Sequence, residues 1–136
     1  MPSWKTRPAE SLPPGLLARA LSLQAEAAKL GFDWPDIAPV WAKLGEEITE
    51  LREAAAEGNP AAIAHELGDV LFSVVNLARF LGVDTEQALI DANQRFCARL
   101  DGIQRALDAA ARDWDECTLV ELEAYWQQAK RAETKP

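Results

Sequence analysis

The sequence contains few of the residues that build covalent frameworks or nucleophilic sites: two cysteines, one histidine and one methionine. Cys97 and Cys117 make neither a disulfide framework nor a zinc site by themselves, so we expect free thiols in a reducing compartment. Phosphate-binding glycine motifs of the forms GxxxxGK[ST] and GxGxxG are missing, and Ser, Cys and His form no nucleophilic set. These absences argue against covalent catalysis and against a P-loop enzyme.

Positive charge is also scarce, because 14 Lys and Arg residues face 22 Asp and Glu residues and leave a net charge of −8. Nucleic-acid backbones and anionic membranes repel such a chain, so we expect neither as a partner. No apolar run approaches the ~20 residues of a membrane span. The opening segment, MPSWKTRPAESLPPG, lacks the apolar core of a signal peptide, and we expect a cytoplasmic protein.

Two groups of carboxylates stand out in the middle of the chain: Glu46, Glu47 and Glu50, then Glu66 and Asp69. Their spacings of three and four residues place each group on one side of a helix, where like charges repel. A hard divalent cation held between two antiparallel helices would offset this repulsion, and Mg²⁺ prefers such oxygen ligands. A solvated acidic helix surface is the alternative that the residues alone leave open.

Apolar residues recur with helical spacing, and no segment alternates with period two. Glycines and capping residues divide this pattern into helices over about 13–30, 36–57, 60–81, 84–111 and 118–130. We therefore predict an all-α protein, with a four-helix core and a C-terminal extra helix.

The predicted organisation is an irregular arm over residues 1–12, a single catalytic domain over 13–131 and a tail over 132–136. Apolar residues make up 49% of the chain, more than a small helical bundle comfortably hides. We therefore expect a homodimer that completes the core, with a dimer of dimers as an open alternative.

The two carboxylate groups, read as EExxE and ExxD, resemble the signature of the MazG-type nucleoside triphosphate pyrophosphohydrolases, an all-α superfamily. Four further stretches resemble a MazG catalytic domain in the same order: GFDWP, ELGDVLFSVVNLARFLGVD, ALIDANQRFCARL and LVELEAYWQQAK. The resemblance covers roughly residues 16–130. It also supports pairing of two chains through their helices.

This resemblance implies Mg²⁺-dependent hydrolysis of nucleoside triphosphates to the monophosphate and pyrophosphate, in nucleotide-pool house-cleaning, with Mn²⁺ as a substitute metal. It implies roles for nine residues: Glu46 as general base; Glu47, Glu50, Glu66 and Asp69 as metal ligands; Asn93, Arg95 and Arg99 as phosphate contacts; and Trp34 as the stacking partner of the base. A narrower substrate, such as dUTP or phosphoribosyl-ATP, is an alternative, as is a non-catalytic acidic helical interaction module.

Several of these residues also have an ordinary structural explanation. Glu46 is also consistent with a solvated glutamate, Asn93 with a polar helix contact and Arg99 with a surface salt bridge. We expect Lys43 to form an ion pair within its helix and His65 to be a partly exposed neighbour of the site. The pattern further assigns Trp41 to the core, and Phe32 to the core or to the end of its helix.

Overall fold

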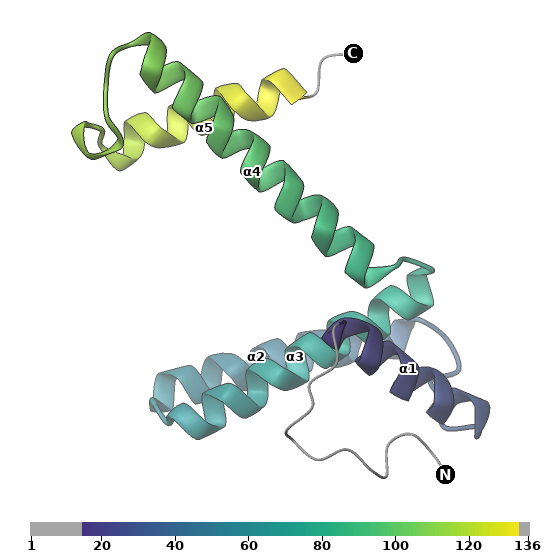
Figure 1. Cartoon of the computed structure of the whole chain (residues 1–136). Helices are drawn as coiled ribbons and strands as arrows, with labels where there is room; N and C mark the ends of the chain where they lie inside the picture. The colour runs from purple at the N-terminus through teal and green to yellow at the C-terminus, as the bar shows by residue number, and fades with distance from the viewer. Residues whose placement is uncertain (1–14, 134–136) are drawn as a thin grey trace. The chain divides into compact units, whose positions relative to one another are not determined.

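A computed structural model describes residues 15–133, which form five α-helices, a short 3-10 helix and no strand (Figure 1). The elements are α1 (Leu16–Lys29), α2 (Ala38–Glu57), α3 (Pro60–Leu81), α4 (Thr85–Ala109), η1 (Trp114–Glu116) and α5 (Leu119–Glu133). The all-α prediction is confirmed. The predicted arm and the last three residues lie outside the described part, while α5 extends through Glu133 into the predicted tail.

The boundaries between α2, α3 and α4 lie where the sequence signals them. Asn59 caps α3, because its side-chain oxygen accepts hydrogen bonds from the N–H groups of Ala61 and Ala62 at 3.0 and 3.2 Å. Gly58 ends α2 and Gly82 ends α3 with φ of +76° and +68°, a left-handed conformation that side chains disfavour. The short turn at Gly58 and Asn59 therefore makes α2 and α3 antiparallel neighbours.

The described chain divides into two compact units, the first ending at Ala88 and the second beginning at Leu89. In the first unit α3 packs against both α2 and α1 (Figure 1). Val40 of α2 and Val75 of α3 are each 1% exposed and form part of its core. A hydrogen bond also joins α1 to the start of α4, since the Ala18 N–H donates to Glu86 Oε1 at 2.9 Å.

The second unit contains most of α4, together with η1 and α5. Gly102 allows α4 and α5 to approach closely, because a Cβ at this position would lie 3.0 Å from the Cβ of Ala129. Ile103 and Leu107 are buried, whereas Leu89 and Phe96, nearer the start of α4, are 50% and 54% exposed. The buried residues of α4 thus lie near Gly102, where α5 packs against it.

Large apolar side chains remain exposed on the first unit. Trp41 is 53% exposed, so its assignment to the core is wrong for the single chain. The helix α3 is also long and apolar enough, by length and composition alone, to cross a membrane. Core helices of soluble proteins meet the same criterion, and α3 carries Glu66 and Asp69, which a bilayer interior would penalise.

Candidate metal site and adjoining pocket

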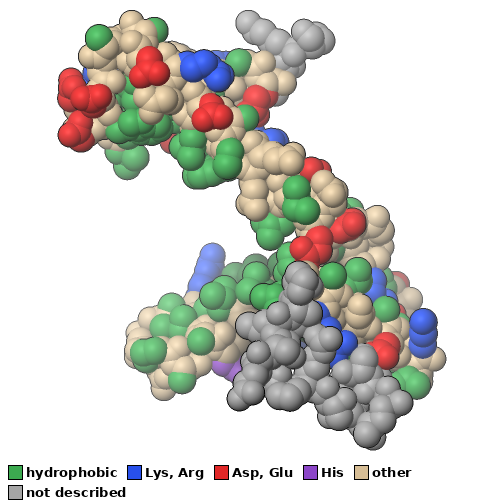
Figure 2. Space-filling model, viewed as in Figure 1, with side chains coloured by type: hydrophobic (Ala, Val, Ile, Leu, Met, Phe, Trp, Pro, Cys, Tyr) green, Lys and Arg blue, Asp and Glu red, His purple; other side chains and the backbone are tan. Residues whose placement is uncertain are grey.

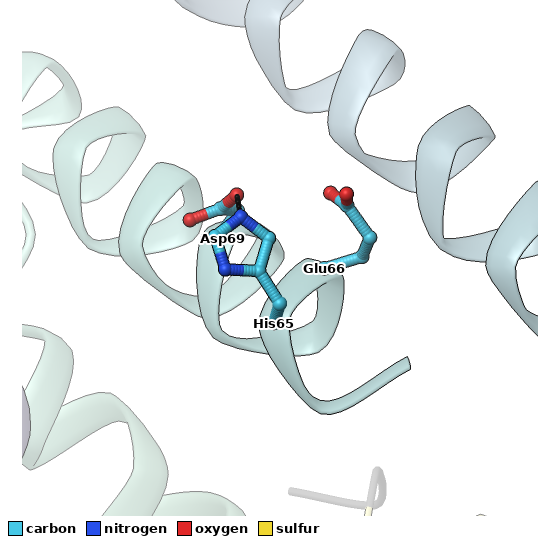
Figure 3. A group of neighbouring side chains, drawn as sticks. All are labelled: His65, Glu66 and Asp69. Atoms are coloured by element: carbon cyan, nitrogen blue, oxygen red, sulfur yellow. Dashed lines mark ion pairs between the residues drawn. The ribbon is translucent and has the colours of Figure 1, made fainter. Parts of the chain in front are cut away.

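The antiparallel pairing of α2 and α3 brings the two predicted carboxylate groups together. Glu47 and Glu50 of α2 and Glu66 of α3 each place an oxygen atom within 4.8 Å of the others. Glu66 also belongs to a second group on α3, with Asp69 and His65, whose ligand atoms lie within the same limit of one another. Figure 3 shows this second group, in which Glu66 extends to the side of the His65–Asp69 pair. Glu66 therefore links the two groups.

Two oxygens of this cluster are buried without a hydrogen-bond partner, Glu47 Oε2 and Glu66 Oε2. Glu47 as a whole is only 4% exposed. A buried charged oxygen without a donor is unfavourable, and one with several like charges nearby is more so. A hard divalent cation would remove both unfavourable features, because it takes the place of the missing donors and neutralises the negative charge. The oxygen-rich donor set thus fits Mg²⁺ or Mn²⁺.

Lys43 partly neutralises the cluster from one turn earlier on α2. Its Nζ lies 2.8 Å from Glu47 Oε1 and 3.6 Å from Glu46 Oε1, which confirms the predicted ion pair within the helix. The hydrogen bond from Lys43 lowers the pKa of Glu47, although burial opposes this effect. The same contact raises the pKa of Lys43. Both groups therefore stay charged over a wide pH range.

Glu50 behaves in the opposite way, because its nearest charges are negative. Repulsion from Glu47, reinforced by Glu66, raises the pKa of Glu50 above its usual range. One carboxyl group held ionised by Lys43 thus lies beside another that resists ionisation. A bound cation would reverse that resistance, because it favours the charged form.

Glu46 and His65 lie at the edge of the cluster. The Glu46 side chain is 58% exposed and contributes to neither of the two sets of ligand atoms that lie within 4.8 Å of one another. His65 is 71% exposed, and its Nε2 lies 3.3 Å from Asp69 Oδ2. His65 is therefore the partly exposed neighbour that the sequence indicated. The role of Glu46 as a general base stays a prediction.

A pocket of about 450 Å³ lies in the first unit beside this cluster. Its lining is mainly apolar and includes Phe32, Trp34 and Phe72. Phe32 is 83% exposed, so its assignment to the core is wrong. Its N–H instead donates to Ala27 O at 3.0 Å and closes α1, as expected of the residue after a left-handed glycine. Lys43 lines the pocket as well and thereby joins it to the carboxylates.

An ion pair that the sequence did not reveal fixes the loop that carries Trp34. Arg79 of α3 donates two hydrogen bonds to the Asp33 carboxylate, at 3.0 and 2.6 Å, and two to Asn76 Oδ1, at 3.1 and 2.9 Å. This contact lowers the pKa of Asp33. The one signal in the sequence was the three-residue spacing of Asn76 and Arg79, which makes them neighbours on a helix.

The three predicted phosphate contacts lie on α4 in the second unit, whereas the carboxylates lie in the first. Asn93 and Arg95 are exposed. Arg99 forms an ion pair with Glu133 at 3.0 Å, and its guanidinium group lies 5.2 Å from the centre of the Trp126 ring. For Arg99 the structure thus shows the salt bridge that the sequence left as an alternative.

Comparison with known proteins agrees with this arrangement. Residues 38–104 match the model of the MazG nucleotide pyrophosphohydrolase domain, a segment that contains both carboxylate groups. The chain is 39% identical over 114 residues to the nucleoside triphosphate pyrophosphohydrolase/pyrophosphatase MazG of Thermotoga maritima, covering 84% of this chain and 44% of that protein. It is 40% identical over 119 residues to the nucleoside triphosphate pyrophosphohydrolase of Escherichia coli K12, covering 86% and 45%.

A more distant match, 36% identical over 83 residues, is the uncharacterized protein YabN of Bacillus subtilis, of which the aligned part covers 16%. The chain spans less than half the length of the curated relatives it matches. The fold, the paired carboxylate groups and these similarities together show that the chain belongs to the MazG family.

Proposed function

We propose that this protein hydrolyses nucleoside triphosphates to the monophosphate and pyrophosphate in a Mg²⁺-dependent reaction that removes unwanted nucleotides. The supporting observation is the cluster of Glu47, Glu50 and Glu66, with oxygens from two helices within 4.8 Å of one another and two buried oxygens unpartnered. The names of the Thermotoga maritima and Escherichia coli relatives support the same reaction class.

In this proposal Glu47, Glu50, Glu66 and Asp69 hold the divalent cation, for which Mn²⁺ is a substitute. When bound, the cation neutralises the phosphates, orients them and lowers the pKa of a water molecule. Without it, the carboxylates would repel a triphosphate, which carries about four negative charges. Glu46 is the general base for the attacking water, since its exposed carboxylate is free of the two ligand groups.

The pocket beside the cluster accommodates the base of the nucleotide. Trp34 is the stacking partner, and the Asp33–Arg79 ion pair holds its loop in place. Stacking of a base on an aromatic side chain contributes ~1–3 kcal/mol and tolerates different bases. Lys43 lies on the pocket wall and beside Glu47, so a triphosphate whose base fills the pocket meets a positive charge before the carboxylates. The roles of Asn93, Arg95 and Arg99 as phosphate contacts stay predictions, and Arg99 is paired with Glu133 in this structure.

We also propose that two chains pair through the apolar surface of α2 and α3. Figure 2 shows hydrophobic side chains over these helices on one face of the first unit. Seven large apolar residues of α2 and α3 are 40% exposed or more: Trp41, Ile48, Leu67, Leu71, Phe72, Val74 and Leu81. Monomeric proteins rarely leave such an extended apolar surface open to water. Light scattering coupled to size exclusion would give twice the monomer mass, or four times for a dimer of dimers, and a monomer would contradict pairing.

The experiment that tests the function is a panel of ribo- and deoxyribonucleoside triphosphates assayed for pyrophosphate release with and without Mg²⁺. We expect Mg²⁺-dependent release from several of them by the wild type and none by Glu66→Gln. Glu123→Gln makes the same substitution at an exposed position of α5 and should retain full activity. Release from dUTP alone would indicate a narrower substrate, and no release from any triphosphate would favour a non-catalytic interaction module.

A further inference from the structure

Gln24 of α1 is a buried polar residue in the wall of the apolar pocket, with only 7% of its surface exposed. Its Nε2 donates a hydrogen bond to the backbone oxygen of Phe72 in α3 at 2.9 Å. Because a carbonyl oxygen only accepts hydrogen bonds, this contact fixes which end of the amide faces α3. The other end, Oε1, is therefore held in a defined orientation.

Gln24 Oε1 is fully buried and has no hydrogen-bond partner. An unsatisfied buried acceptor is unfavourable, so its persistence calls for an explanation. The neighbouring polar groups on the pocket wall are already engaged, since Asn76 Oδ1 accepts from Arg79 and Arg79 donates to Asp33. Among the buried side-chain atoms of residues 15–133 that line this pocket, Gln24 Oε1 is the acceptor left without a donor.

We propose that Gln24 Oε1 accepts a hydrogen bond from an N–H group on the edge of the nucleotide base. This inference rests on the proposed placement of the base in the pocket. Trp34 would then stack on the face of the base, and Gln24 would hydrogen-bond to its edge. The pocket tolerates any base that presents a suitable N–H donor and rejects an analogue that lacks one, because the analogue would leave Oε1 buried and unpaired. Gln24 is thus a specificity-determining residue of the site.

The test uses pairs of nucleotides that differ only in an exocyclic amino group: adenosine against purine riboside, and cytidine against its pyrimidin-2-one analogue. Triphosphates give kcat/KM for pyrophosphate release, and the corresponding monophosphates give Kd by titration calorimetry, which needs no hydrolysis. In the wild type we expect the analogue without the amine to be about 10-fold to 100-fold poorer in at least one pair by both measurements. In Gln24→Met this preference should fall to less than about 3-fold.

Gln104→Met is the matched control, because Gln104 is an exposed glutamine in the second unit, hydrogen-bonded to Asp108 and Trp114. It should keep the wild-type preference. If Gln24→Met does not fold, the wild-type comparison decides by itself, because equal treatment of both members in both pairs would overturn the inference. Pyrophosphate release without discrimination would refute the role of Gln24 alone. Discrimination in monophosphate binding without any release would refute the proposed hydrolysis and support the role of Gln24.

Discussion

Removing the positive charge of Lys43 perturbs both the carboxylate cluster and the edge of the pocket. In Lys43→Met the buried Glu47 loses the hydrogen bond that Lys43 Nζ makes at 2.8 Å, while the apolar part of the side chain is largely kept. Leaving a buried charge without its partner destabilises proteins by ~3–5 kcal/mol. Because the Lys43 side chain is 41% exposed, solvent screens part of this interaction, and we expect a loss of about 1–2 kcal/mol near neutral pH.

The pH dependence of this loss follows from the directions of the two pKa shifts. The lowered pKa of Glu47 gives stability that is present above the unfolded pKa of about 4.3 and is lost as pH falls through the folded value. The raised pKa of Lys43 gives stability that is present below about 10.4 and is lost as pH rises through the folded value. The difference between wild type and Lys43→Met should therefore be largest between these limits and shrink at both ends.

Urea denaturation of metal-free protein measures this difference. Lys130→Met, an exposed lysine of α5, is the matched control and should stay within about 0.5 kcal/mol of wild type. The double variant Lys43→Met/Glu47→Gln should recover part of the loss, because the unpaired charge is then removed. An unfolding free energy for Lys43→Met equal to that of the control, or no recovery in the double variant, would refute this reasoning.

Glu47→Gln and Asp69→Asn should each abolish turnover yet remain folded, since both relieve repulsion in the metal-free cluster; near-normal pyrophosphate release by either variant would place the metal elsewhere. Asp33→Asn should destabilise the protein by about 1 kcal/mol near neutral pH. The loss should shrink as pH falls through the lowered pKa of Asp33, because Arg79 then faces a neutral side chain in the wild type as well as in the variant. Denaturation curves that show the same loss at every pH would contradict this. Trp34→Ala should raise KM for triphosphates about 5-fold to 100-fold with little change in kcat, and an unchanged KM would remove the base from this pocket.

Local rules explain why the helices and the carboxylate cluster were predictable. A glycine in the left-handed conformation, as at Gly58, and a capping side chain, as at Asn59, act within a few residues. They fix a short turn between two long helices, and a short turn makes those helices neighbours. The convergence of Glu47 and Glu66 follows from this antiparallel pairing, so spacing along the chain was sufficient to predict it.

The pocket depends on contacts between distant segments, and for that reason the sequence did not reveal it. Asp33 and Arg79 are 46 positions apart, and Gln24 and Phe72 are 48 apart. Helical periodicity predicts which side of each helix is apolar, but it does not say what covers that side. Trp41 therefore carried the signature of a core residue although it is exposed in the single chain.

The most direct test of the central claim, that α2 and α3 bind one divalent cation through the shared Glu66, is a titration of the protein with Mn²⁺ followed by electron paramagnetic resonance of the free ion. We predict saturable binding by the wild type and by Glu123→Gln, and at least about 10-fold weaker binding by Glu66→Gln. Equal Mn²⁺ affinity in all three proteins would contradict the account.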